Sequence, residues 1–322
     1  MTAPKLFRRI LNFASYAPNN FFQRNIVAWA ESAWQYQEEV LLAKPPIFII
    51  GPPRSGSTLA VQTLINSFGL SYLSNRHAFW FGAPFLIGQP RLPPAGVPRV
   101  SVVSTFGQTQ GPHEPAECGE WWYRFFPRQP AHADGKAASQ RLIQFRRSVL
   151  HLAGAADSSL IFKNMFASLR IPQVSKVLPE ARWIVMNRDL CDIAKSILNA
   201  RHALYGSYSR WWSLRPPGSF PFDESPPHVQ AVEQARQTYQ TIESDLLHSN
   251  IPGKRIHRLS YERLCTDRQA TLDEVEAFFR TNEIKAVRRN SPDEDRAVKN
   301  TSSLPPLLAR QIDEYAESIR HG

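Results

Sequence analysis

Residues 47–59 read IFIIGPPRSGSTL, and this stretch decides the fold of the chain. Its first four residues are apolar and three of them are β-branched, which predicts a buried strand. Gly51, two prolines and Gly56 then predict a tight loop, and a helix is expected to begin at Ser57. In a strand, loop and helix of this order, the loop N–H groups and the helix N-terminus face an anion. The stretch therefore predicts a loop that binds a phosphate-like group.

The spacing of Gly51 and Gly56 matches the ATP-binding P-loop, in which a lysine and then a serine or threonine follow the second glycine. Thr58 stands where that motif has its serine or threonine, but Ser57 replaces the lysine. The loop thus lacks the cation that reaches the β- and γ-phosphates, while Arg54 supplies a positive charge two residues before Gly56. These residues favour an anion smaller than a triphosphate. A glycine- and proline-rich turn without a ligand is the alternative at this point.

The sequence PPRSGST at residues 52–58 resembles the 5′-phosphosulfate-binding loop of the sulfotransferase family. Members of this family use 3′-phosphoadenosine 5′-phosphosulfate (PAPS) as sulfonate donor, release 3′-phosphoadenosine 5′-phosphate (PAP) and need no metal ion. The resemblance implies that the loop binds the 5′ side of the donor. The residues to which it gives this role are Pro53, Arg54, Ser55, Gly56, Ser57 and Thr58.

A second stretch, ARWIVMNRDLCDIAKSILNAR at residues 181–201, resembles the other nucleotide signature of the family. In that signature a strand ends in Arg-Asp-Pro, and a serine follows eight residues after the arginine, as Ser196 follows Arg188 here. Leu190 replaces the proline, which alters the turn but removes no ligand. The resemblance implies that Arg188 and Ser196 bind the 3′-phosphate, and a guanidinium and a hydroxyl at a strand end suit such a group. A solvated charge pair of Arg188 and Asp189 on an ordinary turn is the alternative.

Two further segments follow in the order of the family. RLSYERLCTDRQATLDEVEAFF at residues 258–279 resembles a strand, a Tyr-Glu-x-Leu motif and a helix, and it places Tyr261 either beside the nucleotide or in a structural role. Its apolar residues predict core packing by Leu264, Leu272, Val275, Phe278 and Phe279. RAVKNTSS at residues 296–303 resembles a basic segment that folds over the nucleotide, which makes Arg296 and Lys299 candidate ligands. The Arg-Lys-Gly triplet of cytosolic sulfotransferases is absent.

Sulfonate transfer needs cationic groups that stabilise charge on the sulfonate and a base that accepts the acceptor proton. The charge on the sulfonate can be stabilised by Arg54, by the N–H groups of its loop and by Lys163, which ends a predicted strand. As in phosphoryl transfer, most of the remaining work is positioning.

The candidate bases lie in GPHEPAECGEWW, residues 111–122, which resembles the Pro-x-Glu-x-Glu segment of many bacterial members. This resemblance makes Glu117 the first candidate, followed by Glu120 and His113. The alternative is that the carboxylates simply begin a helix, where the helix dipole favours them.

The rest of the chain predicts an α/β fold. Strands are expected at residues 159–163, 182–187 and 255–259, besides a short strand at 99–104. Helices are expected at residues 139–153, 170–178, 189–200, 229–249, 271–280 and 304–319. This alternation predicts a three-layer sandwich with a central, mainly parallel sheet. The resemblance implies the sulfotransferase version of the fold of P-loop nucleoside-triphosphate hydrolases.

The chain is expected to consist of an N-terminal helical segment at residues 1–44, with a long helix at 20–43, and a single domain at 45–322. Irregular inserts are expected in this domain at residues 82–115 and 206–227, which are rich in proline. Five tryptophans in or beside these inserts suit sugar or lipid acceptors if they are exposed, and otherwise belong to the core. They are Trp80, Trp121, Trp122, Trp211 and Trp212.

The composition narrows the partners and the compartment. The 38 Lys and Arg against 28 Asp and Glu give a net charge of +10, which favours anionic partners, but no nucleic-acid-binding motif is present and none is expected as partner. Three widely spaced cysteines favour neither a disulfide framework nor a zinc site, and they predict a reducing, cytoplasmic location. No apolar run is long enough to cross a bilayer. The basic start, MTAPKLFRRILNFASYA, is a poor signal peptide and predicts a surface helix that contacts membrane peripherally.

These features together predict an enzyme that transfers the sulfonate group of PAPS to a hydroxyl or amine of a carbohydrate, a lipid or another small molecule. Two alternatives stay open. A P-loop small-molecule kinase would need the missing lysine and a magnesium-binding acid. A non-catalytic module of the same fold would bind an anionic ligand and transfer nothing.

Overall fold

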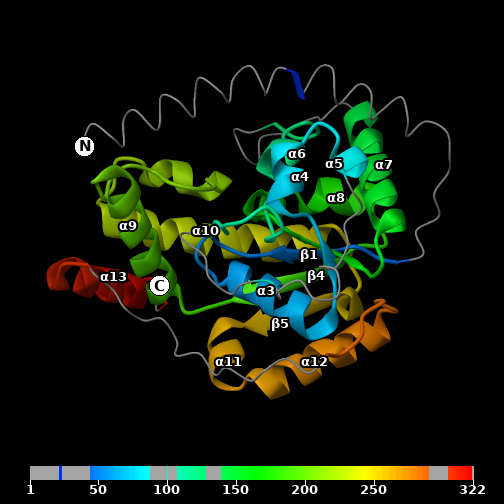
Figure 1. Ribbon diagram of the computed structural model, residues 1–322. Coiled ribbons are helices and arrows are strands. Elements are labelled where there is room, and N and C mark those ends of the chain that lie inside the picture. The colour runs from blue at the N-terminus through cyan, green and yellow to red at the C-terminus, as the bar shows by residue number, and fades with distance from the viewer. Residues whose placement is uncertain are drawn as a thin grey trace.

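A parallel five-stranded sheet forms the centre of the molecule in the computed structural model, which describes residues 22–23, 44–87, 100, 107–127, 139–289 and 304–320 (Figure 1). The strand order is β2-β3-β1-β4-β5, and every neighbouring pair is parallel. The strands are β1 (Ile47–Ile50), β2 (Ser71–Tyr72), β3 (Leu160–Lys163), β4 (Arg182–Asn187) and β5 (Ile256–Ser260). The predicted α/β architecture is confirmed.

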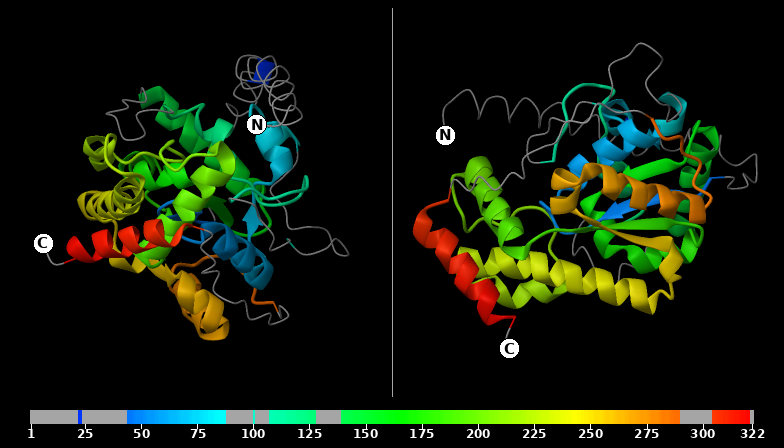
Figure 2. Two further views of the ribbon diagram at one scale, coloured as in Figure 1. Left: turned by 90° about the vertical axis from the view of Figure 1, so that its left-hand side faces the viewer. Right: turned by 90° about the horizontal axis from the view of Figure 1, so that it is seen from below.

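Helices cover both faces of this sheet, as the views in Figures 1 and 2 show. The α-helices are α3 (Ser57–Phe68), α4 (Asn75–Phe79), α5 (Pro84–Ile87), α6 (Gly119–Trp122), α7 (Ser139–Ala155), α8 (Ile171–Val177), α9 (Leu190–Tyr205), α10 (Pro227–His248), α11 (Tyr261–Thr266), α12 (Arg268–Thr281) and α13 (Pro306–Ser318). Three 3₁₀ helices are described: η2 (Met165–Leu169), η3 (Pro217–Phe222) and η4 (Gly253–Arg255). Helices α3, α11 and α12 pack on one face of the sheet, and α7, α8 and α10 pack on the other.

Strand β1 joins the two cores because its side chains alternate between the faces. Ile47 and Ile49 pack with α3 and α12, whereas Phe48 and Ile50 pack with α7, α8 and α10. The ring of Phe48 stacks on Phe162 of β3 and Trp183 of β4, with centroid separations of 5.1 and 5.2 Å. All four residues of β1 are at most 1% exposed, as expected for a central parallel strand. The loop that follows β1 therefore starts from the most deeply buried strand of the sheet.

The predicted elements that lie within the described residues agree with the structure, apart from differences at their ends. The predicted helix at 189–200 extends to Tyr205 as α9, because the chain offers no break until Gly206. Gly206 ends it in the left-handed conformation, φ 69°, and its N–H donates to His202 O at 2.7 Å. Four short elements escaped prediction because they are too short to show a hydrophobic period: β2, α4, α5 and α11. The alternative of a helix start at the carboxylates agrees with α6, whose first turn contains Glu120.

The two proline-rich inserts are only partly described. The insert at 206–227 contains η3, and the insert at 82–115 contains α5. Of the strand expected at 99–104, the described residues include only Val100. The basic N-terminal segment, nearly all of the helix expected at 20–43, and the candidate ligands Arg296 and Lys299 lie outside the described residues.

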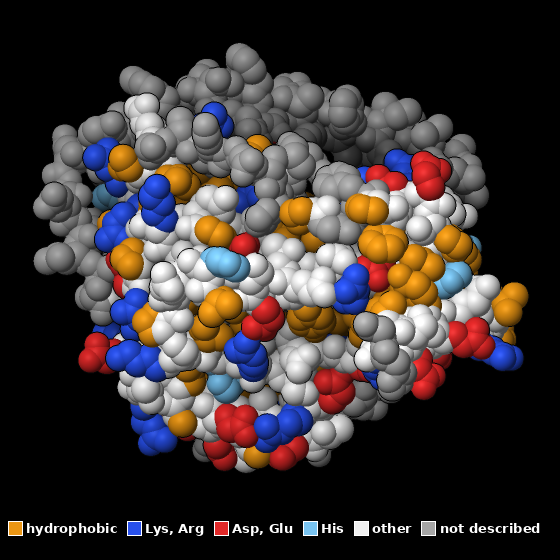
Figure 3. All heavy atoms as spheres, turned by 180° about the vertical axis from the view of Figure 1, so that it is seen from behind, with side chains coloured by type: hydrophobic (Ala, Val, Ile, Leu, Met, Phe, Trp, Pro, Cys, Tyr) orange, Lys and Arg blue, Asp and Glu red, His pale blue; other side chains and the backbone are white. Residues whose placement is uncertain are grey.

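The surface of the described part mixes charges of both signs. Seen from behind, basic side chains lie among acidic ones over much of the molecule (Figure 3). Within the described ranges, no helix is both long and apolar enough to span a membrane.

Candidate functional site

A cavity of about 790 Å³ lies at the carboxyl ends of β1, β3 and β4. In parallel α/β sheets this edge is where ligands bind, because the loops that follow neighbouring strands meet there. The loop after β1, the start of α3, Lys163, Arg188 and the inner face of α9 all line the cavity. Residues 107–109 and 115–118 close it from the side of α4 and α6.

The loop after β1 presents the start of α3 to this cavity. Gly56 is the N-cap residue of α3, and no side chain caps the helix. The first N–H groups of a helix have no acceptor within it, so an uncapped end is a site for an anion. Ser57 and Thr58, in the first turn of α3, line the cavity.

Two features require a glycine at position 56: the left-handed backbone and the lack of space for a side chain. Its φ is 89°, in the left-handed region, and a Cβ atom there would lie 2.3 Å from Cδ2 of Tyr261. Tyr261, the first residue of α11, thus packs directly on the loop. The guanidinium of Arg188 also lies over the Tyr261 ring, 4.2 Å from the centroid.

The two predicted nucleotide motifs are in direct contact. Arg188 Nη1 donates to the carbonyl oxygen of Arg54 at 2.8 Å, and Arg54 Nε donates to Ser196 Oγ at 2.9 Å. Burial and the nearby charge of Arg188 lower the pKa of the Arg54 guanidinium. Two partly buried guanidinium groups this close repel each other, so an anion bound beside them would be stabilised by both.

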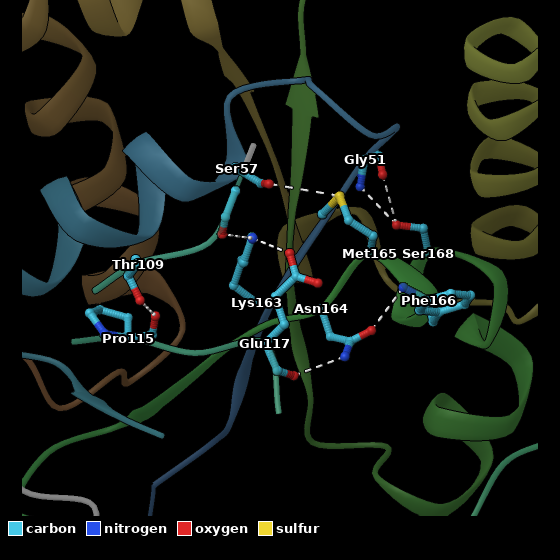
Figure 4. Close-up of polar contacts among 11 residues, drawn as sticks. Gly51, Ser57, Thr109, Pro115, Glu117, Lys163, Asn164, Met165, Phe166 and Ser168 are labelled. Atoms are coloured by element: carbon cyan, nitrogen blue, oxygen red, sulfur yellow. Dashed lines mark hydrogen bonds and ion pairs between the residues drawn. The ribbon is translucent and has the colours of Figure 1, made fainter. Parts of the chain in front are cut away.

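Lys163 and Glu117 form an ion pair in the cavity (Figure 4). The side chain of Lys163 is 6% exposed, and that of Glu117 is 37% exposed. Lys163 Nζ also donates to Gly107 O at 3.4 Å. A Cβ atom on Gly107 would lie 3.6 Å from both Lys163 Nζ and Thr58 Oγ1, which places the ion pair beside the start of α3.

The segment after β3 supports both sides of the cavity (Figure 4). Asn164 Nδ2 donates to Glu117 O at 2.8 Å, and its Oδ1 accepts from Phe166 N–H at 2.8 Å. Ser168 Oγ accepts from Gly51 N–H at 2.9 Å and donates to Gly51 O at 3.0 Å. One short segment thus fixes the start of the loop after β1 and the backbone of Glu117.

The sequence matches the profile of the Sulfotransferase family over residues 45–283, which is most of the chain. This protein belongs to the sulfotransferase family. A comparison with curated protein sequences gave no significant match.

Solved structures of bacterial sulfotransferases share the fold. Sulfotransferase STF9 from Mycobacterium avium aligns with a TM-score of 0.55 and 14% identity, covering 92% of this chain and 82% of that one. Sulfotransferase STF1 from Mycobacterium tuberculosis H37Rv aligns with a TM-score of 0.50 and 16% identity, covering 90% of this chain and 76% of that one. At these identities the likeness shows the fold alone.

Most of the site residues predicted for this sulfotransferase lie in the cavity lining. They are Pro53, Arg54, Gly56, Ser57, Thr58, Glu117, Lys163, Arg188, Ser196 and Tyr261. Ser55 is fully buried and does not line the cavity. The other two candidate bases lie outside its lining: His113 is exposed, and Glu120 lies in the first turn of α6.

The predicted tryptophans separate into core and cavity residues. Trp121 and Trp122 are 0% and 2% exposed and pack in the core under α7. Trp212 lines the cavity, whereas Trp80 and Trp211 do not.

Several polar residues of the lining were missed in the sequence. They are Gln62, Asn75, Gln108, Thr109, Asn199 and Ser213. Asn199 lies three residues after Ser196 on α9, so helical spacing alone could have identified it. The others lie at positions that only the folded chain brings to the cavity, such as Asn75, whose Nδ2 donates to Thr109 Oγ1 at 3.1 Å.

Within the described part of this sulfotransferase, no three His, Cys, Asp or Glu side chains are grouped as they are at a metal site.

The contact between Gly56 and Tyr261 can be tested by comparing two glycine variants. Gly206 is also left-handed, φ 69°, but a Cβ atom added there would have no atom within 4 Å. We expect Gly206→Ala to lower the free energy of unfolding by about 1–2 kcal/mol, the cost of the left-handed conformation. Gly56→Ala should lower the free energy of unfolding by about 2–5 kcal/mol, because the new methyl group must also push the Tyr261 ring out of its position. Urea denaturation measures both, and equal losses would contradict the close contact.

Proposed function

We propose that this sulfotransferase transfers the sulfonate group from PAPS to a hydroxyl group of a small-molecule acceptor. Membership of the family supports sulfonate transfer in general. The choice of PAPS rests on one observation: the uncapped start of α3 and the Arg188–Ser196 pair open onto the same cavity. PAPS carries anionic groups at both its 5′ and 3′ positions, so it suits two such sites at once.

In the proposed complex, the N–H groups of Ser57 and Thr58 bind the 5′-phosphosulfate. Arg188 and Ser196 bind the 3′-phosphate. Arg54 of the loop, whose guanidinium contacts Ser196, stabilises negative charge at both sites. Tyr261 supports Arg188 through its ring.

The remaining predicted residues have other roles in the proposal. Pro53 and Ser55 shape the loop, and Arg296 and Lys299 remain candidate ligands.

The lysine that reaches the β- and γ-phosphates in P-loop enzymes has no counterpart at this position. Ser57 stands there, and its Oγ donates to Met165 Sδ at 3.8 Å. The proposed donor needs no cation to bridge a triphosphate, so the proposed reaction uses no metal ion.

During transfer, the acceptor oxygen forms a bond to sulfur while the bond from sulfur to the 5′-phosphate oxygen of the donor breaks, which leaves PAP. Lys163 and the loop N–H groups stabilise the negative charge that develops on the transferred group and on the leaving phosphate. Glu117 accepts the acceptor proton. Its ion pair with Lys163 holds its carboxylate in the cavity, and the bond from Asn164 Nδ2 holds its backbone carbonyl.

The assignment of the 3′-phosphate is tested by Arg188→Ala and Ser196→Ala. A charge-assisted contact contributes about 1.5–3 kcal/mol, so Arg188→Ala should weaken PAP binding about 10- to 100-fold. Binding of adenosine 5′-phosphate, which lacks the 3′-phosphate, should change much less. Calorimetry in the presence of a chelator measures both ligands. Arg263→Ala is the control, because Arg263 pairs with Glu274 outside the cavity lining. Equal losses for the two nucleotides would remove Arg188 and Ser196 from the 3′ site.

The assignment of the base is tested by Glu117→Gln, which keeps the shape of the side chain and removes its basicity. A general base contributes about 10²–10⁴-fold to the rate, so kcat should fall by that factor while the affinity for PAP stays nearly constant. Glu120→Gln and His113→Asn are the controls, since neither residue lines the cavity. Near-normal turnover of Glu117→Gln, with loss of activity in either control, would assign the base to that control residue instead.

A further inference from the structure

The loop between α9 and η3 forms a wall of the cavity that the proposed donor site does not use. Trp212 and Ser213 of this loop line the cavity, and Trp212 is half-buried. Ser213 has a φ of 68°, a left-handed conformation that residues other than glycine rarely adopt. Such a conformation persists where the surrounding structure holds it, and it is frequent at ligand sites.

A buried guanidinium holds this loop from behind. Arg201, near the end of α9, is 0% exposed. Its Nη1 donates to Tyr208 O at 3.2 Å and to Gln230 Oε1 at 2.8 Å, and its Nη2 donates to Gln234 Oε1 at 3.1 Å. Gln234 Nε2 in turn donates to Trp212 O at 2.8 Å and to Leu214 O at 2.7 Å. The carbonyl groups on both sides of Ser213 are therefore fixed by α10.

Burying the charged guanidinium of Arg201 costs free energy, because none of the groups that accept these hydrogen bonds is an anion. This cost argues for a role of Arg201 beyond packing. The acceptors of these Arg201 bonds are amides and a backbone carbonyl, and its Nε has no hydrogen-bond partner among the described residues. Burial and the nearby Arg215 lower its pKa to about 10, so it stays charged at neutral pH. Both guanidinium groups lie over the ring of Trp211, at 5.0 and 4.4 Å from its centroid. In some proteins a buried charged network fixes one arrangement of the chain, and this one holds the carbonyl groups of Trp212 and Leu214.

The loop packs beside the proposed transfer site. Leu214 is fully buried against Met165 and Leu169, in the segment that follows Lys163. Met165 itself lines the cavity. On the other side, Ser196, Asn199 and Ala203 share one face of α9 and line the cavity from the proposed 3′-phosphate site towards the loop. Trp212 and Ser213 thus line the same cavity as the residues of the proposed transfer site.

We propose that Trp212 and Ser213 bind the acceptor and that Arg201 is a positioning residue that fixes them. This inference rests on the proposed function. The acceptor class it names is a small alcohol that carries a ring, aromatic or sugar, because the indole of tryptophan offers a flat apolar face to such a ring. The hydroxyl of Ser213 provides a hydrogen bond to a polar group on the acceptor.

The experiment compares phenol, methyl glucoside and 1-hexanol as acceptors of the full-length enzyme with PAPS. Trp212→Ala should raise KM about tenfold for at least one of the two ring alcohols and leave KM for hexanol within about twofold. The affinity for PAP, measured by calorimetry, and kcat at saturating acceptor should stay within about twofold. Trp80→Ala is the matched control, because Trp80 is half-buried and does not line the cavity. Ser213→Gly, which tolerates the left-handed backbone, should raise KM without loss of stability.

Arg201→Gln should reproduce the rise in KM for the same ring alcohol without a change in PAP affinity, and Arg201→Lys should recover part of it. If Arg201→Gln does not fold, Trp212→Ala and Ser213→Gly decide the proposal. It is overturned if Trp212→Ala leaves KM for both ring alcohols unchanged, if it weakens PAP binding to the same extent, or if the wild-type enzyme binds PAP but sulfonates neither ring alcohol. A wild-type enzyme that does not bind PAP contradicts the proposed function itself, and this inference with it.

Discussion

The close approach of Tyr261 to Gly56 is the contact on which the rest of the site depends. Because position 56 has no side chain, the Tyr261 ring packs on the loop after β1, and the guanidinium of Arg188 lies over the same ring. Arg188 then bonds the carbonyl of Arg54, whose guanidinium bonds Ser196. One chain of contacts thus joins three motifs that lie far apart in the sequence. A side chain at position 56 would separate the loop after β1 from Arg188, which follows β4.

The sheet explains why these motifs meet. Strand β1 is central and buried on both faces, and its neighbours are β3 and β4. Since all three run parallel, Lys163, which ends β3, lies at the same edge as Gly51 and Arg188, which follow β1 and β4. The segment after β3 then fixes the arrangement, because Ser168 bonds both backbone groups of Gly51 and Asn164 bonds the backbone of Glu117. The start of the loop after β1 and the backbone of Glu117 are thereby held at the cavity.

Much of this could be predicted from the sequence, because the information is local. The strand IFII, the glycine spacing after it and the Arg188–Ser196 interval each carry their own signal, and the resemblance to the family gave their order. What escaped prediction depends on contacts between distant residues. The ion pair of Lys163 and Glu117 spans 46 positions, and the bonds of Ser168 to Gly51 span 117. The Trp-Trp pairs at 121–122 and 211–212 look alike in the sequence. Only tertiary packing buries Trp121 in the core and places Trp212 at the cavity.

The central claim is that one cavity holds both anionic ends of a 3′-phosphorylated adenine nucleotide. A crystal structure of the complex with PAP tests it most directly. The account predicts the 5′-phosphate within hydrogen-bond distance of the N–H groups of Ser57 and Thr58, and the 3′-phosphate within hydrogen-bond distance of the side chains of Arg188 and Ser196. A nucleotide bound outside this cavity, or one whose 3′-phosphate contacts neither Arg188 nor Ser196, would contradict it.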